Sequence, residues 1–178
     1  MKTIKIHDKE FSLYIKEEDI QDRVKKVAED ITRDMAGKNP LFLIVLNGAF
    51  MFAGDLFKYV NFPCEISFVK LSSYIGTKTT SVVRELIGLD EVLHDRSVVI
   101  IEDIIDTGIT MGVTQEKLKK LEAEEVKIAT LLFKPDAFKM NYKIDYIGLE
   151  IPNDFIVGYG LDYDGHGRNL PDIYKIIE

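Results

Sequence analysis

The sequence predicts an α/β fold in one domain, residues 1–178, with a mostly parallel, twisted sheet that carries helices on both faces. Two runs of consecutive apolar residues, 41–46 and 98–101, are typical of strands buried on both faces. Each run is followed by a short segment containing glycine and then by a helical pattern, which is the alternation expected of parallel α/β folds. A chain of 178 residues, 46% apolar and 30% charged, is long enough for one full core.

Charge and composition exclude several classes of partner. The formal net charge is −7, which argues against a nucleic-acid backbone or an anionic membrane as the main partner. No apolar run reaches membrane-spanning length, and the first ten residues lack the apolar segment of a signal peptide. The single cysteine, Cys64, cannot form an intrachain disulfide, which favours a reducing compartment. We therefore expect a cytoplasmic protein without membrane or nucleic-acid partners.

The elements follow from periodicity and punctuation. Residues 3–15 indicate one or two short strands around a turn at 8–9, and residues 17–36 indicate a helix. One face of this helix is apolar at spacings of three and four: Ile20, Val24, Val27, Ile31 and Met35. The helix predicted after residue 108 has Met111, Thr114, Leu118 and Leu121 on one face. The other predicted elements are a helix at 50–59, strands at 64–71, 84–87, 126–133 and 145–151, and a long polar loop at about 72–83.

The stretch from Val98 to Thr110 combines the features of a phosphate site and a sugar site. Its apolar run is followed by Glu102 and Asp103, two isoleucines, and the segment 106–110, Asp-Thr-Gly-Ile-Thr, which leads into a helix. Unpaired backbone N–H groups at a helix N-terminus suit a phosphate, and a glycine allows close approach. Carboxylates suit sugar hydroxyls or Mg²⁺. The plainer alternative is a helix cap beside solvated acids; the whole constellation favours a phosphorylated sugar.

This stretch closely resembles the phosphoribosyl-pyrophosphate (PRPP) motif of the type I phosphoribosyltransferases. That motif is a hydrophobic strand, two acids, two apolar residues and Asp-Thr-Gly-x-Thr, and the form found here, Glu-Asp-Ile-Ile-Asp-Thr-Gly, is similar to the hypoxanthine-guanine branch. The resemblance extends from about Leu41 to Arg168. It implies the type I phosphoribosyltransferase fold, with a small hood from about 1–15 and 150–178. It also implies a homodimer or homotetramer and a mobile lid that begins at Ser73 and Tyr74.

The resemblance implies a reaction and roles for the central motif. The enzyme would transfer 5-phosphoribose from PRPP to N9 of a 6-oxopurine, hypoxanthine or guanine, and release pyrophosphate. Asp106 is the implied general base, at N7 of the purine. The implied PRPP-binding residues are Glu102, Asp103, Asp106, Thr107, Gly108, Ile109 and Thr110. The implied cofactor is Mg²⁺, held by Asp162, Glu102 and Asp103.

The remaining site residues also come from the resemblance. Asn47, Gly48 and Arg168 are assigned to pyrophosphate, with a cis peptide between Leu46 and Asn47, although many family members have lysine where this chain has Asn47. The residues assigned to the purine are Lys134, Phe155, Val157 and Asp162. Because an ammonium group only donates hydrogen bonds, a lysine suits a 6-oxo group and not the 6-amino group of adenine. The plainer alternatives are a tight turn at Gly48, a solvent-facing lysine, a core phenylalanine and a surface Asp–Arg pair.

Two other functions stay open. The same fold occurs in regulators that bind PRPP or nucleotides and control nucleic-acid binding, but the acidic charge and the lid residues argue against that class. A phosphoribosyltransferase for another base, such as xanthine, would differ only in the hood, where Lys134 and Phe155 favour a 6-oxopurine. His7 and His94 are isolated in the sequence, His166 lies between two glycines and is assigned no catalytic role, and no His/Cys cluster has zinc-site spacing.

Overall fold

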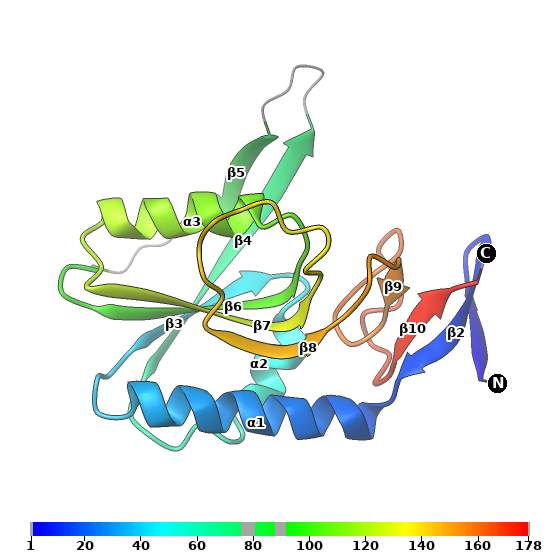
Figure 1. Ribbon diagram of the computed structural model, residues 1–178, viewed down its shortest axis with the longest axis horizontal. Coiled ribbons are helices and arrows are strands. Elements are labelled where there is room, and N and C mark those ends of the chain that lie inside the picture. The colour runs from blue at the N-terminus through cyan, green and yellow to red at the C-terminus, as the bar shows by residue number, and fades with distance from the viewer. Residues whose placement is uncertain (1, 76–80, 88–91, 178) are drawn as a thin grey trace.

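The computed structural model describes residues 2–75, 81–87 and 92–177, which form a large and a small β-sheet (Figure 1). The large sheet has the strand order β5-β4-β3-β6-β7-β8 and the small sheet the order β1-β2-β10-β9. The helices are α1 (Glu17–Met35), α2 (Phe50–Leu56) and α3 (Ile109–Lys120). The strands of the large sheet are β3 (Leu41–Leu46), β4 (Glu65–Ile75), β5 (Ser81–Ile87), β6 (Ser97–Ile105), β7 (Glu125–Phe133) and β8 (Tyr146–Glu150). Those of the small sheet are β1 (Thr3–Ile6), β2 (Lys9–Ile15), β9 (Ile156–Val157) and β10 (Ile173–Ile176).

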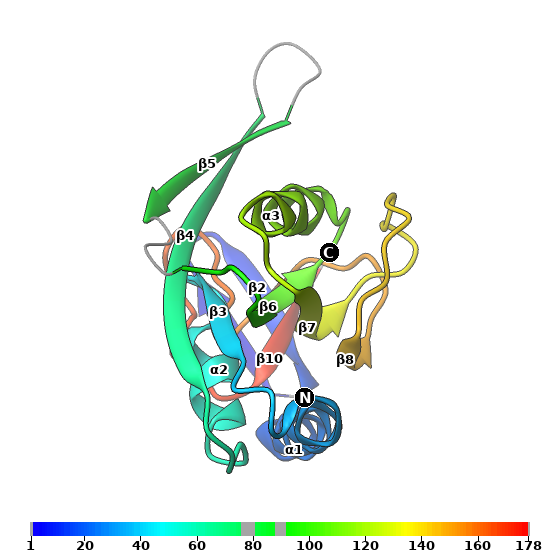
Figure 2. The same cartoon turned by 90° about the vertical axis from the view of Figure 1, so that its left-hand side faces the viewer.

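Helices cover both faces of the large sheet, as the sequence predicts. Figure 2 shows α3 on one face and α1 and α2 on the other. The apolar face predicted for α1 is buried, together with Ala28. Phe42 and Ile44 of β3 belong to the core on the α1 side, whereas Leu41 and Leu43 belong to the core on the α3 side. This explains why β3 is apolar without alternation.

The strand order creates a crevice at one edge of the large sheet. Strands β4, β3, β6, β7 and β8 are parallel, and among the described strands of the large sheet only β5 runs antiparallel to its neighbour, β4. The chain passes from β3 to β4 on one side and later returns to β6 on the other side of β3. In open α/β sheets, ligands bind beyond the carboxyl ends of the strands at such a switch point.

Several predicted boundaries are wrong. Strand β6 continues through the two acids to Ile105, because Glu102 pairs with Thr130 and Ile105 with Phe133 of β7. Residues 72–75 and 81–83, predicted as loop, belong to β4 and β5, which pair as an antiparallel hairpin. Helix α2 ends at Leu56 and not at residue 59. Leu121 is not on the buried face of α3; it caps the helix and is 43% exposed.

The small sheet joins the two ends of the chain. Strand β2 lies between β1 and β10, and β10 also pairs with β9. Phe11 and Tyr174 are fully buried in its core, beside Val157. The predicted fold class, a parallel α/β sheet with an added small sheet, is confirmed. In the described part of the chain, no helix has both the length and the apolar character needed to cross a bilayer.

Candidate active site

The phosphate loop predicted at 106–110 lies at the carboxyl end of β6 and at the start of α3. Gly108 is the N-terminal cap of α3 and has a φ of +80°, a conformation that other residues rarely adopt. Gly108 has no side chain to cap the helix, Thr107 Oγ1 accepts a long hydrogen bond of 3.5 Å from the N–H of Ile109, and no acidic residue occupies the described first turn. The N-terminal N–H groups of α3 are therefore suitable for an anion.

Two aromatic residues that the sequence analysis missed hold this loop. A β-carbon on Gly108 would lie 2.3 Å from the ring of Phe138 and 2.8 Å from Tyr142 Oη. Tyr142 Oη donates a hydrogen bond of 2.6 Å to the carbonyl oxygen of Gly108. Burial, and then the nearby Glu102 carboxylate, raise the pKa of Tyr142 to about 12, so that its hydroxyl stays a donor at neutral pH. No local sequence pattern links residues 138 and 142 to the motif.

The two acids of the motif are buried beside each other. Glu102 is 9% and Asp103 8% exposed, and Asp103 Oδ1 accepts a hydrogen bond of 2.8 Å from the N–H of Ile104. Burial, and then the charge of Asp103, raise the pKa of Glu102 well above its usual value. The pair therefore holds a proton more readily than two separate carboxylates would, and a nearby cation or emerging positive charge would offset the repulsion between them.

The predicted pyrophosphate loop packs against Asp103. The peptide bond between Leu46 and Asn47 is cis, as the resemblance implies. The side chain of Asn47 is exposed, whereas a β-carbon on Gly48 would lie only 1.7 Å from Asp103 Oδ2. Glycine is therefore required at position 48 by this close approach, which the sequence analysis could not distinguish from a simple turn.

The loop that follows β9 also packs against Gly48. A β-carbon on Gly160, whose φ is +96°, would lie 2.0 Å from the carbonyl oxygen of Gly48. The neighbouring Tyr159 is buried and donates a hydrogen bond of 2.6 Å to Asp55 Oδ2 of α2. Residues 48, 103 and 160 are thus brought into contact by tertiary structure, and the sequence analysis identified no role for Gly160, Tyr159 or Asp55.

Asp162 and Arg168, which the resemblance assigns to different ligands, form an ion pair, as the plainer alternative of an Asp–Arg pair expects. Arg168 Nη2 lies 2.7 Å from Asp162 Oδ1, and Arg168 Nη1 donates to the carbonyl oxygen of Gly160 at 2.7 Å. Asp162 Oδ2 accepts a hydrogen bond of 2.7 Å from the N–H of Gly165. Both charged side chains are 29% exposed, so the guanidinium is accessible at the rim of the site.

Lys134 is a buried lysine at the carboxyl end of β7. It is 8% exposed, and its Nζ lies 3.5 Å from Asp106 Oδ2 and 3.4 Å from Asn153 Oδ1. The interpretation of Lys134 as an ordinary solvent-facing lysine is therefore wrong. Asn153 is a further site residue that the sequence analysis passed over.

The two apolar residues predicted to contact the purine differ in their surroundings. Phe155 is 45% exposed, although its ring centroid lies 5.8 Å from that of Tyr163 and 6.3 Å from that of Phe11. It is not a core residue, and its ring is available for stacking. Val157 is fully buried, with its side chain in the core of the small sheet. Only its backbone is left for the predicted contact.

Two cavities meet at the motif. One, of about 290 Å³, is lined by the ends of β3 and β6 and by the 106–110 loop. The other, of about 250 Å³, is lined by Lys134, Phe155, Asp162 and Arg168 among others. Both are also lined by Asp103, Ile104 and Asp106. A ligand with an anionic end and a flat ring can therefore occupy both, with its central part against these carboxylates.

The donor atoms at this site fit Mg²⁺ in part. The second cavity is lined by oxygen donors of Asp103, Asp106 and Asp162, and Mg²⁺ prefers oxygen ligands. Each carboxylate oxygen has about two acceptor sites, so Asp162 keeps acceptor capacity beside its two hydrogen bonds. Among the described residues there is no group of three or more ligating side chains that could hold a metal ion. Mg²⁺ commonly uses one or two carboxylates with water and substrate phosphates, and this donor set is consistent with that mode.

The fold and the site define a class of protein, and comparison with known families names it. Residues 15–164 match the family described as the phosphoribosyl transferase domain. The chain belongs to this family.

The curated and solved relatives are more specific. The chain is 43% identical over 156 residues to a hypoxanthine-guanine phosphoribosyltransferase from Streptococcus thermophilus, covering 87% of each chain. A solved hypoxanthine phosphoribosyltransferase from Staphylococcus aureus superposes with a TM-score of 0.88 at 37% identity, covering 93% of this chain and 91% of that one. A hypoxanthine-guanine phosphoribosyltransferase from Bacillus anthracis gives a TM-score of 0.88 at 36% identity, covering 93% and 98%.

Proposed function

We propose that the protein transfers 5-phosphoribose from PRPP to N9 of a 6-oxopurine, hypoxanthine or guanine, and releases pyrophosphate. The observation that carries the proposal is the meeting of two cavities at Asp103, Ile104 and Asp106. The relatives named as hypoxanthine-guanine phosphoribosyltransferases support it. In this arrangement the 5′-phosphate occupies the first cavity, the base the second, and the ribose the border between them.

The phosphate end of PRPP is assigned to the 106–110 loop. The N–H groups at the start of α3 and the hydroxyls of Thr107 and Thr110 supply donors, and no acid in the described first turn opposes the phosphate charge. We assign pyrophosphate to the backbone of Asn47 and Gly48 and to Arg168. The ion pair of Arg168 with Asp162 supports that assignment, because it holds the guanidinium at the rim of the cavity.

The base is assigned to the second cavity. Phe155 supplies a half-exposed ring for stacking, and Lys134 supplies an ammonium group that only donates hydrogen bonds. The ammonium group suits the 6-oxo oxygen of hypoxanthine or guanine. It would oppose the 6-amino group of adenine, and unpaired buried polar groups discriminate strongly. Backbone carbonyls near Asp162 are assigned to the 2-amino group of guanine.

Asp106 is assigned the proton transfer. Its carboxylate lines both cavities and lies 3.5 Å from Lys134 Nζ, next to the position assigned to the base. There it accepts the proton that the purine loses, at N7, while the buried carboxylates of Glu102 and Asp103 stabilise positive charge on the ribose. Asp162, Glu102 and Asp103 are the residues that would hold Mg²⁺, and bound Mg²⁺ would neutralise charge on the pyrophosphate.

The assay that tests this function measures pyrophosphate release from PRPP and Mg²⁺ with hypoxanthine, guanine, xanthine, adenine or no base. Release with hypoxanthine or guanine, and not with adenine, is the expected result. Release with xanthine alone would favour an enzyme for another base. PRPP binding without release would favour a regulator that binds PRPP or nucleotides, and nucleic-acid binding would be tested next.

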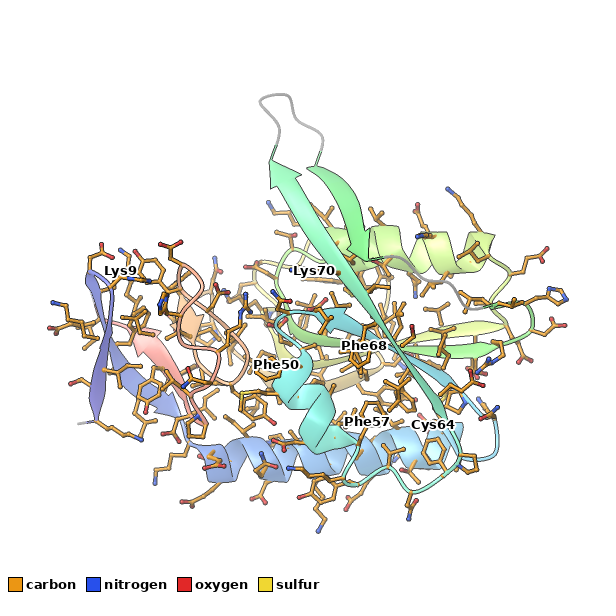
Figure 3. The ribbon with its side chains drawn as sticks, turned by 180° about the vertical axis from the view of Figure 1, so that it is seen from behind. Lys9, Phe50, Phe57, Cys64, Phe68 and Lys70 are labelled. Carbon is orange, nitrogen blue, oxygen red and sulfur yellow. The ribbon has the colours of Figure 1, made fainter. Side chains whose placement is uncertain are left out.

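Assembly, lid and location belong to the same proposal. Ile66 and Phe68 of β4 and Phe50 of α2 are each 45–47% exposed, and Figure 3 shows Phe50 and Phe68 on neighbouring elements. Exposed apolar groups of this kind support a homodimer or homotetramer. Ser73 and Tyr74, assigned to the lid, lie in β4, and the segment 76–80 lies outside the described residues. We expect the protein to act in the cytoplasm.

A further inference from the structure

Two histidines that are isolated in the sequence meet in the loops of the small sheet. His7 lies in the turn between β1 and β2, and His166 follows the turn at residues 164–165. His7 Nε2 lies 3.0 Å from His166 Nδ1, although 159 positions separate the two residues. Their ring centroids are 4.4 Å apart, with the rings at 84°. Tertiary structure thus creates a histidine pair that no sequence pattern indicates.

A backbone carbonyl completes a triangle of donor atoms. The carbonyl oxygen of Asp164 lies 3.1 Å from His166 Nδ1 and 3.4 Å from His7 Nε2. The three atoms are therefore neighbours of one another. Only one proton fits between the two facing nitrogens, so at least one imidazole must present a lone pair to the other. Two imidazole nitrogens and a carbonyl oxygen this close together are the kinds of atom that bind a cation.

The dimensions of the triangle match a metal coordination shell. Ligands about 2.1 Å from an ion are separated by about 3.0 Å in octahedral and about 3.4 Å in tetrahedral geometry. The observed separations, 3.0, 3.1 and 3.4 Å, lie within this interval. A point about 2.1 Å from all three atoms lies about 1 Å out of their plane. The spacing of the three atoms therefore allows one ion to contact all of them.

We propose that His7 Nε2, His166 Nδ1 and the carbonyl oxygen of Asp164 bind a divalent transition-metal ion of the Zn²⁺ class. Imidazole ligands suit zinc, copper and nickel, whereas Mg²⁺ prefers oxygen. The site is thus chemically distinct from the carboxylates assigned to Mg²⁺. Because the described residues contain no group of three ligating side chains, water fills the remaining coordination positions.

The ligands are held in place by the surrounding turns. Asp164 and Gly165 both have positive φ, +49° and +81°, and the bridge between Tyr163 and His166 closes this two-residue turn. Tyr163 Oη donates a hydrogen bond of 2.8 Å to Asp8 Oδ1 in the first turn. A bound ion therefore joins the hairpin of β1 and β2 to the segment between Asp162 and Arg168, the two charged residues of the active site.

The test is titration of the full chain with Zn²⁺ by calorimetry, in the presence of saturating Mg²⁺ to occupy the carboxylates. One Zn²⁺ per chain is expected, and saturation should raise the unfolding midpoint by about 5 °C. The variants H7N and H166A should each lose this binding and this shift. Asparagine is chosen at position 7 because it tolerates the positive φ of His7, +53°. H94A is the matched control, because it removes an exposed histidine elsewhere and should bind like the natural chain.

Two results would overturn the proposal. One is no stoichiometric Zn²⁺ binding by the natural chain, and the other is unchanged binding in either H7N or H166A. Without zinc, H7N and H166A should unfold within a few degrees of the natural chain and release pyrophosphate normally, which separates loss of the site from loss of the fold. A variant that fails this check is replaced by H166N, for which the same two outcomes apply.

Discussion

Replacing Gly48 with alanine is expected to lower kcat/KM about 100-fold, through displacement of Asp103. The new β-carbon would lie 1.7 Å from Asp103 Oδ2, whereas an ordinary contact is at least 3.4 Å, so the carboxylate must retreat by about 1.7 Å. A misplacement of about 1 Å in an active site can cost about 100-fold in rate, which corresponds to about 2.7 kcal/mol of transition-state stabilisation. Steady-state kinetics with PRPP and hypoxanthine measure the effect.

The matched control for G48A is G54A. Gly54 lies inside α2, and a β-carbon there would have no atom within 4 Å. Alanine should stabilise this helix by up to about 1 kcal/mol and leave kcat/KM unchanged. In a double-mutant cycle, G48A should destabilise the natural chain but not D103A, because D103A removes the clashing carboxylate. Full activity of G48A, or equal destabilisation in both backgrounds, would refute the packing of Gly48 against Asp103.

Three further predictions concern the neighbours of this contact. D106N should lower kcat by at least about 100-fold and change the Kd of PRPP far less; unchanged turnover would contradict the role of Asp106 as a base. The pKa of Glu102 in the folded chain lies well above 4.5, its ordinary value in the unfolded chain. Between these two pKa values the folded chain keeps a proton that the unfolded chain has lost, so the free energy of unfolding falls as the pH rises through this interval. E102Q should therefore be stabilised relative to the natural chain more at pH 8 than at pH 5 in thermal unfolding, and a pH-independent difference would contradict this. Y142F removes the hydrogen bond to the carbonyl oxygen of Gly108, and it should lower the free energy of unfolding by about 1 kcal/mol and raise KM for PRPP. If Y142F and the natural chain had the same stability and the same KM, the bond would not hold the loop.

Local patterns predict much of this fold. The buried face of α1, the buried run of β3 and the order of strand, motif and helix around Asp106 follow from the spacing of apolar residues, since these elements bury their apolar faces in the core. The ends of the strands are harder to predict from sequence. The apolar pattern of β6 ends at Glu102, yet the strand continues because its backbone keeps pairing with β7. The two acidic side chains in this last part of the strand are buried. Polarity alone does not indicate such a buried polar strand end.

The supporting contacts of the site depend on tertiary structure. Gly160 covers Gly48, and Tyr142 bonds to Gly108, across separations that no periodicity encodes. Single glycines and tyrosines are common in loops, so the presence of Gly160 and Tyr142 in the sequence did not indicate a role in the site. The same reason explains why no contact between His7 and His166 was predicted. Motif resemblance indicated which residues contact substrate, and only the structure identified those that hold them.

The most direct test of the account is the ratio of kcat/KM for hypoxanthine to that for adenine, measured for the natural chain and for K134Q. The buried ammonium of Lys134 lies between Asp106 and Asn153 and only donates. The natural chain should favour hypoxanthine by at least about 10⁴-fold. In K134Q, whose amide can also accept, the ratio should fall at least tenfold, whereas K139Q, an exposed lysine nearby, should keep it. An unchanged ratio in K134Q, or comparable use of adenine by the natural chain, would contradict the assignment of the base site.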